Sequence, residues 1–195
     1  MSHKAVTNRY MLKKYFPLIS WRWKKVIDFG CGKGEWGFLI KTHIEPNVWI
    51  TGIDIHKKYL DLLSKFKIYD KIINADFLKY DFNEKFDVAL MMEVLEHLSF
   101  EEGLKLIKIA RDCTKEAIFI STPINEPQDA MEDNPREKHI SEWDCPILES
   151  LGFKILENFR MPLLPRSLRF FDDVRRIIFC LPKPRKIIAW LKLNG

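Results

Sequence analysis

The sequence predicts an α/β fold in which helices cover a doubly wound, mostly parallel sheet. Short apolar runs of strand length alternate along the chain with segments of helical periodicity, which is the pattern of repeated strand–helix–strand units. The run at residues 86–91 is almost continuously apolar, as expected of a central parallel strand buried on both faces. A chain of 195 residues with 47% hydrophobic residues is long enough for one well-buried domain and short for two, so residues 1–195 are interpreted as a single domain.

The segment 26–37, VIDFGCGKGEWG, is predicted to form the first strand, a tight turn and the start of a helix. Three glycines follow the strand at alternate positions: Gly30, Gly32 and Gly34. Their missing Cβ atoms would let a ligand lie against the loop, and the helix that begins near Glu35 offers free backbone N–H groups to it. Asp28 lies at the carboxyl end of the strand, where a carboxylate would repel a pyrophosphate and attract an ammonium or another cationic ligand.

Two nucleotide-binding motifs compete with this interpretation of the glycine turn. Gly32, Gly34 and Gly37 also satisfy the G-x-G-x-x-G spacing of a dinucleotide site. Such a fingerprint opens with the first glycine after the strand, which is Gly30, and its third glycine would then fall on Glu35. This offset argues against a dinucleotide site. A P-loop is excluded because Gly34 stands where Ser or Thr is required. An ordinary glycine turn between strand and helix stays open as the alternative without a ligand.

An acidic residue also follows the second predicted strand, residues 48–53. Asp54 lies about 20 positions after Gly34, where a carboxylate in a doubly wound sheet can accept hydrogen bonds from both hydroxyls of a ribose. The alternative role is a helix N-cap, because Asp is favoured there as well. Beside Asp54, Ile55 is placed to form an apolar wall for an adenine ring.

Charged side chains follow the apolar run at 86–91. Glu93, Glu96 and His97 have the i, i+3, i+4 spacing that would put them on one face of a helix starting near Glu93. Such a face, placed at the carboxyl end of a central strand, is a candidate catalytic surface. The alternative is that Glu96 and His97 only solvate a helical turn.

A long loop, residues 122–139, follows the fifth predicted strand. It holds three prolines and five acidic residues and is too long for a simple connection. Long loops at strand ends often carry function, and His139 closes this one. The same patterns predict the remaining elements: a cap helix at 5–19, helices at 35–43, 59–66, 103–111 and 146–151, and strands at 71–74, 117–121 and 153–159.

The spacing Asp-x-Gly-x-Gly-x-Gly at 28–34 resembles motif I of class I S-adenosylmethionine (SAM) dependent methyltransferases. The E-V-L-E-H segment at 93–97 is similar to the turn after motif IV in members that act on small molecules, such as those of ubiquinone biosynthesis. The segments S-T-P at 121–123 and H-x-x-E-W at 139–143 recur in the family as well. The resemblance covers residues 24–160 and implies a Rossmann-like fold, methyltransferase activity and SAM as the cofactor.

The resemblance also implies a role for each cofactor-binding residue. Asp28 and the glycine loop would hold the methionine end of SAM, Asp54 its ribose, and Asp76 the amino group of its adenine. The full expected set is Asp28, Gly30, Cys31, Gly32, Gly34, Asp54, Ile55, Asp76, Phe77 and Met92.

Polar side chains after the fourth predicted strand are implied to face the transferred methyl group. His97 or His139 is the candidate general base, because histidine titrates near neutral pH, and Glu93 is the third candidate catalytic residue. The acceptor is expected between the turn at 93–97 and the loop at 122–143. It is expected to be a hydroxyl of a small molecule, a glycan or a lipid-linked compound.

Two other functions stay open. Glu93, Glu96, His97 and His139 resemble the metal site of small-RNA 3′-terminal 2′-O-methyltransferases, and carboxylate with imidazole suits a divalent cation that could ionise a ribose hydroxyl. Most carriers of E-V-L-E-H act without metal and the chain has no separate RNA-binding module, so no metal is assigned and nucleic acid is the less favoured partner. The other open function is that of a regulator that binds SAM without catalysing a reaction.

The two ends of the chain differ from the expected core at 24–160. Residues 1–23 are expected to form the helical cap, and no apolar run suits a signal peptide or a membrane span, so a cytoplasmic protein with reduced cysteines is expected. The net charge is +5, and nine Lys or Arg against two Asp fall from residue 160 onward. The tail at 161–195 is therefore expected to contact an anionic membrane surface, either as two helices broken by prolines or with 186–193 returned to the sheet as a strand.

Overall fold

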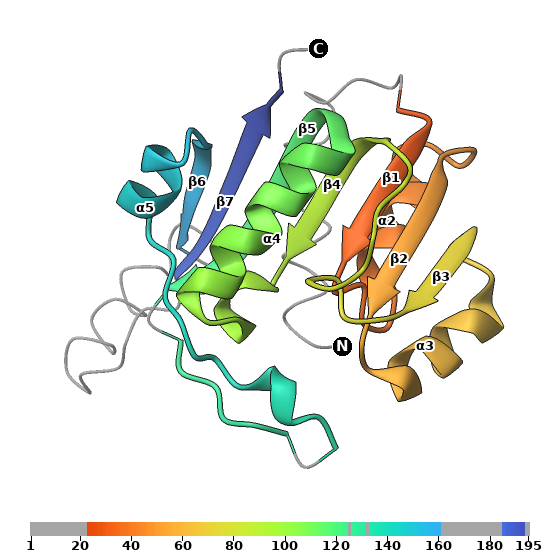
Figure 1. The fold of residues 1–195 in the computed structure, drawn as a ribbon, viewed down its shortest axis with the longest axis horizontal. Coiled ribbons are helices and arrows are strands. Elements are labelled where there is room, and N and C mark those ends of the chain that lie inside the picture. The colour runs from red at the N-terminus through yellow and green to blue at the C-terminus, as the bar shows by residue number, and fades with distance from the viewer. Residues whose placement is uncertain (1–22, 125, 132, 161–184, 194–195) are drawn as a thin grey trace, which may run out of the picture.

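The computed structural model describes residues 23–124, 126–131, 133–160 and 185–193, and these form one seven-stranded sheet (Figure 1). The strand order is β3-β2-β1-β4-β5-β7-β6. The strands are β1 (Lys25–Phe29), β2 (Trp49–Asp54), β3 (Lys71–Asn74), β4 (Phe86–Met92), β5 (Thr114–Ile124), β6 (Lys154–Arg160) and β7 (Arg185–Lys192). The first five strands pair in parallel, and β7 is antiparallel to both of its neighbours. This confirms the doubly wound, mostly parallel fold.

Helices cover both faces of the sheet. They are α2 (Glu35–His43), α3 (Lys57–Leu63), α4 (Phe100–Cys113) and α5 (Cys145–Ser150), with short 3₁₀ turns η2 (Ser64–Phe66), η3 (Leu95–His97) and η4 (Pro135–Glu137). Apolar side chains of α2 and α3 pack on one face, and those of α4 and α5 pack on the other, where α4 lies in front of β4 and β5 in Figure 1. The polar ends of the parallel strands meet at one edge of the sheet, and in the described part of the chain no helix layer closes that edge.

The central strand β4 shows why the sheet needs two helical layers. Val88 and Leu90 point to the α2 layer, and Ala89 and Met91 point to the α4 layer; all four are fully buried. This confirms the buried central strand that the continuous apolar run predicts.

Helix α4 is longer than the helix predicted at 103–111 because its first turn is capped. The Ser99 hydroxyl accepts a hydrogen bond from the Glu102 backbone N–H, and the Glu102 carboxylate accepts one from the Ser99 N–H. This reciprocal pair satisfies two backbone donors that would otherwise lack partners, so the helix can start at Phe100.

The last strand corrects one reading of the tail. Residues 185–192 are not part of an amphipathic helix: they form β7, which lies between β5 and β6, and Ile187, Ile188 and Ala189 are buried in the sheet. The apolar side chains that suggested a surface anchor here serve the core, and the core extends past residue 160. Residues 1–22 of the cap expected at 1–23 lie outside the described residues, and so do residues 161–184 and 194–195 of the tail expected at 161–195. In the described part of the chain, no helix has the length and apolar character that crossing a membrane requires.

Candidate active site

A cleft opens where β1, β2, β3 and β4 end, and it collects most of the residues that the sequence singled out. Eight of the predicted residues line it: Gly30, Gly32, Asp54, Ile55, Asp76, Phe77, Glu93 and His97. Six further lining residues were not predicted: Tyr59, Val94, Leu98, Asn134, Arg136 and Glu137. The carboxyl ends of parallel strands meet at one edge of a sheet, so residues distant in the sequence converge there.

The three alternate glycines serve different purposes. All have positive φ, at 66° for Gly30, 51° for Gly32 and 86° for Gly34. A Cβ on Gly34 would overlap the buried side chain of Leu63, so Gly34 is required for packing against α3. Among the described residues, a Cβ on Gly32 would meet only the Gly30 carbonyl oxygen, 4.0 Å away, so the space beside Gly32 is open toward the cleft there. A ligand can therefore approach the backbone at Gly32.

Asp54 braces the glycine loop from the end of β2. Its Oδ2 accepts a hydrogen bond from the Gly32 N–H at 2.9 Å, and its Oδ1 accepts one from the His56 N–H at 2.8 Å. The N-cap of α3 is His56, so the alternative role of Asp54 as a helix cap does not apply. Each carboxylate oxygen has a second lone pair, which leaves Asp54 able to accept hydrogen bonds from a ligand in the cleft.

Asp76, Phe77 and Ile55 form the neighbouring wall. Asp76 Oδ1 accepts a hydrogen bond from the Leu78 N–H at 3.0 Å, which orients its carboxylate. The Phe77 ring packs edge-on against Phe29 with 6.1 Å between ring centroids. Ile55 is 37% exposed although it is apolar, so this side of the cleft offers apolar surface next to two carboxylates.

Asp28, by contrast, faces away from the cleft. It is 2% exposed, and its Oδ2 accepts a 2.5 Å hydrogen bond from the Tyr69 hydroxyl, which in turn accepts one from the Gly37 N–H of α2. Burial raises the pKa of Asp28 to about 7, the Tyr69 hydrogen bond lowers it in part, and the charge of Asp54 raises it further. Asp28 is absent among the described residues that line the cleft, and its predicted contact with a ligand stays a prediction.

Three other predicted cofactor residues also lie outside the cleft lining: Cys31, Gly34 and Met92. Cys31 and Met92 are buried in the layer between the sheet and α2. Burial is the main cause that raises the pKa of the Cys31 thiol, with the Asp28 and Asp54 carboxylates adding to it, so this thiol stays protonated.

The backbone at Glu93 corrects the predicted helical face. Glu93 has a φ of 60°, in the left-handed region, and the next regular turn is the 3₁₀ turn at Leu95–His97. Glu93, Glu96 and His97 therefore do not share one helical face. Glu93 lines the cleft and accepts a 2.7 Å hydrogen bond from the Ser121 hydroxyl at its Oε1, whereas Glu96 is 2% exposed and lines a second cavity.

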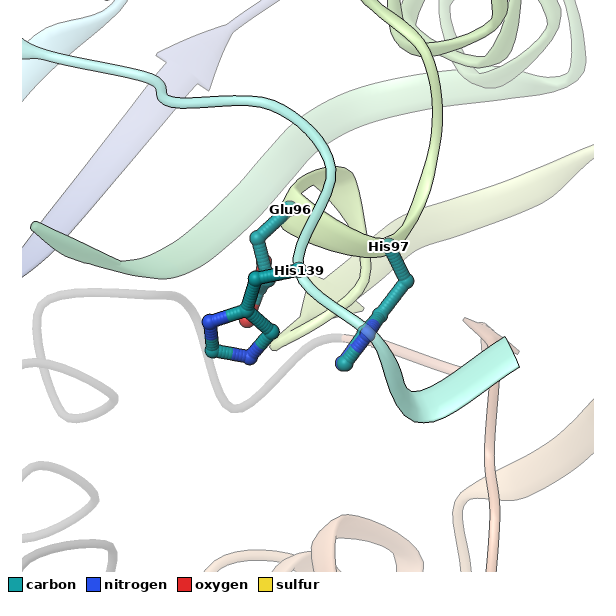
Figure 2. Close-up of side chains that lie close together, drawn as sticks. All are labelled: Glu96, His97 and His139. Atoms are coloured by element: carbon teal, nitrogen blue, oxygen red, sulfur yellow. The ribbon is translucent and has the colours of Figure 1, made fainter. Parts of the chain in front are cut away.

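His97 and His139 lie side by side near Glu96 (Figure 2), with 4.8 Å between their ring centroids. His97 comes from η3 and His139 from the long loop after β5. Burial is the main cause that holds the pKa of His97 below its usual value, so the ring is neutral at pH 7. His97 faces the first cleft and His139 faces the second cavity, so the predicted pair of candidate bases is brought together at the boundary between them.

Backbone hydrogen bonds fix the long loop to η3. The Glu96 carbonyl oxygen accepts hydrogen bonds from the N–H groups of Ile140 at 2.8 Å and Ser141 at 3.3 Å. The fully buried Trp143 donates from its indole N–H to the Leu95 carbonyl at 3.2 Å. The H-x-x-E-W segment therefore anchors the loop, which explains why His139 returns to the site.

Half of the lining residues that sequence analysis missed come from residues 133–137 of this loop. His56 Nε2 donates to the Asp133 carbonyl at 3.0 Å, and the Tyr59 hydroxyl donates to Glu137 Oε1 at 3.3 Å. These contacts bring the loop across to α3 and place Arg136 at the cleft. The length of the loop was the only sequence signal for them, because pairings over such a separation leave no local pattern.

Comparisons with known proteins agree with this geometry. The family model described as "Methyltransferase domain" matches residues 26–117. The ubiquinone biosynthesis O-methyltransferase of Pelagibacter ubique (strain HTCC1062) is 33% identical over 95 residues, which is 43% of this chain and 38% of that protein. The chain thus spans well under half the length of this curated relative.

Solved structures share the fold at low sequence identity. A SAM dependent methyltransferase from Archaeoglobus fulgidus has a TM-score of 0.63 and 21% identity, covering 98% of this chain and 94% of that chain. The plantazolicin methyltransferase BpumL, solved with a triazolic desmethylPZN analog and SAH, has a TM-score of 0.66 and 17% identity, covering 100% of this chain and 86% of that chain.

The fold, the glycine loop with its bracing carboxylate and the domain match together define the class. The comparisons support a class I SAM-dependent methyltransferase: the methyltransferase-domain model matches residues 26–117, just under half of the chain, and the sheet has the fold of the solved methyltransferases. The family resemblance drawn from the glycine and E-V-L-E-H segments is confirmed.

Proposed function

We propose that this protein binds SAM in the cleft and transfers its methyl group to a hydroxyl oxygen of a small molecule. One observation carries the proposal: Gly32, Asp54 and Asp76 come from three separate strand ends and line the same cleft. One relative is named as a ubiquinone biosynthesis O-methyltransferase, and this name supports methyl transfer to an oxygen of a small molecule.

The residues present fit SAM by their chemistry. Asp54 has acceptor capacity left for the two ribose hydroxyls, and Asp76 has the same for the adenine amino group. Ile55 and Phe77 offer apolar surface to the adenine ring. The open space at Gly32 suits a ligand that lies against the loop backbone. Asp28 is then a positioning residue, because its hydrogen bond with Tyr69 links β1 to the first turns of α2.

SAM, when bound, supplies both the electrophilic methyl group and the leaving group, so the chain needs to orient the acceptor and take up its proton. His97 suits the second task because its Nδ1–H donates to the Lys138 carbonyl at 3.2 Å, which leaves Nε2 with the lone pair. Glu93, held by Ser121 at the end of β4, is placed to orient the acceptor hydroxyl.

The second cavity is the proposed place for the body of the acceptor. It is lined by Glu96, Pro123, Glu126, Pro127, His139, Ile140, Ser141 and Glu142. Three carboxylates in one wall repel a polyanion, which disfavours RNA and favours a neutral or cationic acceptor. A small molecule or a glycan with free hydroxyl groups meets this requirement, and so does the hydroxyl of a lipid-linked sugar.

Contact with a membrane is proposed only for residues 161–184, since β7 belongs to the sheet. This segment holds five Lys or Arg and several large apolar residues. Flotation of the full chain with anionic vesicles, weakened by added salt, would support the contact, and equal behaviour with zwitterionic vesicles would contradict it.

Transfer of labelled methyl groups tests the proposed activity. The full chain is incubated with methyl-labelled SAM and with small-metabolite, glycan, lipid and RNA fractions. We expect label in the hydroxyl-bearing non-nucleic-acid fractions. Label confined to RNA would overturn the acceptor class, and a protein that binds SAM but labels none of the fractions would be a regulator.

A further inference from the structure

We propose that Glu96, His97 and His139 form a binding site for a first-row divalent metal ion. Each side chain offers one ligand atom, and these atoms all lie within 4.8 Å of one another. Figure 2 shows the two imidazole rings beside the Glu96 side chain. Two imidazole nitrogens with one carboxylate oxygen are a ligand set that suits Zn²⁺, Fe²⁺ or Co²⁺ better than Mg²⁺, which prefers oxygen ligands.

The hydrogen bonds of the two rings prepare them for this role. His97 donates from Nδ1–H to the Lys138 carbonyl at 3.2 Å, and His139 donates from Nδ1–H to the Glu126 carbonyl at 2.5 Å. Both rings therefore present the lone pair of Nε2. Metal-ligating histidines typically use the second ring nitrogen in this way, which fixes the tautomer and the ring orientation.

The scaffold holds the three ligands in a fixed relation. Glu96 and His97 are adjacent in η3, and the backbone oxygen of Glu96 accepts the N–H groups of Ile140 and Ser141, the residues that follow His139. The Glu96 side chain is 2% exposed, so an ion against its carboxylate would be shielded from water, which strengthens their attraction. Glu93 is not part of this set, because its carboxylate is directed to Ser121 and the first cleft.

The position of the site suggests a function for the ion. His97 lines the cleft assigned to SAM, whereas Glu96 and His139 line the cavity assigned to the acceptor. An ion held by all three residues would stand at the boundary of the two spaces. This consequence rests on the proposed function: with an ion bound, Nε2 of His97 would be a ligand and not the base, and the metal would instead lower the pKa of an acceptor hydroxyl so that its proton can leave to water.

Metal uptake is measured without reference to activity. The full chain, freed of metal with chelator, is titrated with Zn²⁺ by calorimetry and with Co²⁺ by visible absorption, where imidazole ligation gives d–d bands. We expect one tight site. His97→Asn and His139→Asn should each weaken it by more than about tenfold, since even the loss of an outer-shell partner costs about that much.

Asn is the chosen replacement because its amide N–H can still donate to the carbonyl that holds each ring, while the Nε2 ligand is lost. Glu96→Gln completes the set. His43→Asn is the matched control, because His43 is exposed at the end of α2, where its ring contacts the neighbouring Thr42 hydroxyl. Circular dichroism of every variant establishes that the fold is kept.

The outcomes separate this site from the proposed function. Absence of a stoichiometric site in the wild type, or a site lost in His43→Asn but kept in the other variants, would overturn the metal site. Binding of S-adenosylhomocysteine is measured on the metal-free protein, where we expect it to persist. A metal site without binding of SAM or its product would leave the metal site standing and contradict the proposed function.

Discussion

The hydroxyl of Tyr69 and the carboxyl of Asp28 form a 2.5 Å hydrogen bond inside the layer between the sheet and α2. Both side chains are buried, and the Tyr69 hydroxyl also accepts the Gly37 N–H at 3.0 Å. The pair joins β1, α2 and the start of β3, and it lies on the side of the glycine loop that faces away from the cleft. The contribution of the Asp28 carboxyl to the free energy of unfolding can be measured by unfolding the protein at different pH values.

Asp28 is predicted to make the protein less stable as pH rises. Its pKa is about 7 in the folded state against 3.8 for an ordinary Asp, so between these values the unfolded chain has lost the proton and the folded chain keeps it. The free energy of unfolding therefore falls across this window, by about 4 kcal/mol, and levels off above it. Urea unfolding over a pH series should show this fall in the wild type and a flatter profile in Asp28→Asn, which cannot ionise. Equal slopes in both proteins would contradict the buried, protonated carboxyl.

Gly32 and Gly34 are predicted to differ when each is changed to Ala. Both have positive φ, so each change costs about 1–2 kcal/mol of backbone strain. Gly34→Ala adds an overlap with Leu63, which costs about 1–3 kcal/mol more. Gly32→Ala instead puts a methyl group into the cleft, so it should weaken binding of S-adenosylhomocysteine strongly while the protein stays folded. Thermal unfolding and calorimetry on the pair separate the two roles, and equal loss of affinity and stability in both would contradict them.

Glu93→Gln is predicted to lower turnover by roughly 10²-fold while leaving cofactor affinity nearly unchanged, because the change removes only the carboxylate charge beside the acceptor. The matched control is Ser121→Ala, which removes the 2.7 Å hydrogen bond that orients Glu93 but keeps its charge. We expect a smaller loss in the control. Wild-type turnover in Glu93→Gln would exclude Glu93 from the reaction.

The last strand is predicted to be essential for stability. Ile188 is 2% exposed between β5 and β6, so Ile188→Ala should lower the free energy of unfolding by about 2–5 kcal/mol. Lys192→Ala changes an exposed position of the same strand and should have an effect within about 0.5 kcal/mol. Urea unfolding measures both. If Ile188→Ala is as stable as the wild type, the strand does not belong to the core.

Much of the sheet was predictable because its strands are short apolar runs that end in recognisable residues. The turn at Gly30, Gly32 and Gly34 and the spacing to Asp54 placed the ends of β1 and β2 at one site, and the structure agrees. Strand β7 was only one of two readings of its segment, because residues 187–191 suit either a strand or an amphipathic helix. Its pairing with β5 and β6 is non-local and decides between them.

The candidate site was less predictable where the backbone departs from regular structure. A non-glycine residue with positive φ has no reliable sequence signal, so the helical spacing of Glu93, Glu96 and His97 suggested one shared face that the φ of 60° at Glu93 prevents. Asp28 was assigned to a ligand because of its position at the strand end. Its hydrogen-bond partner in the structure, Tyr69, lies 41 residues away and could not be inferred from local pattern.

Calorimetric titration with SAM and S-adenosylhomocysteine tests the central claim most directly. We expect saturable one-to-one binding that Asp54→Ala weakens roughly ten- to a hundredfold, because charge-assisted hydrogen bonds worth about 1.5–3 kcal/mol are lost. The matched control is Asp61→Ala on α3, where the exposed carboxylate of Asp61 pairs with Lys57 away from the cleft, and the affinity of this variant should equal that of the wild type. Absence of binding by SAM and its product, or tight binding of NAD instead, would contradict the account.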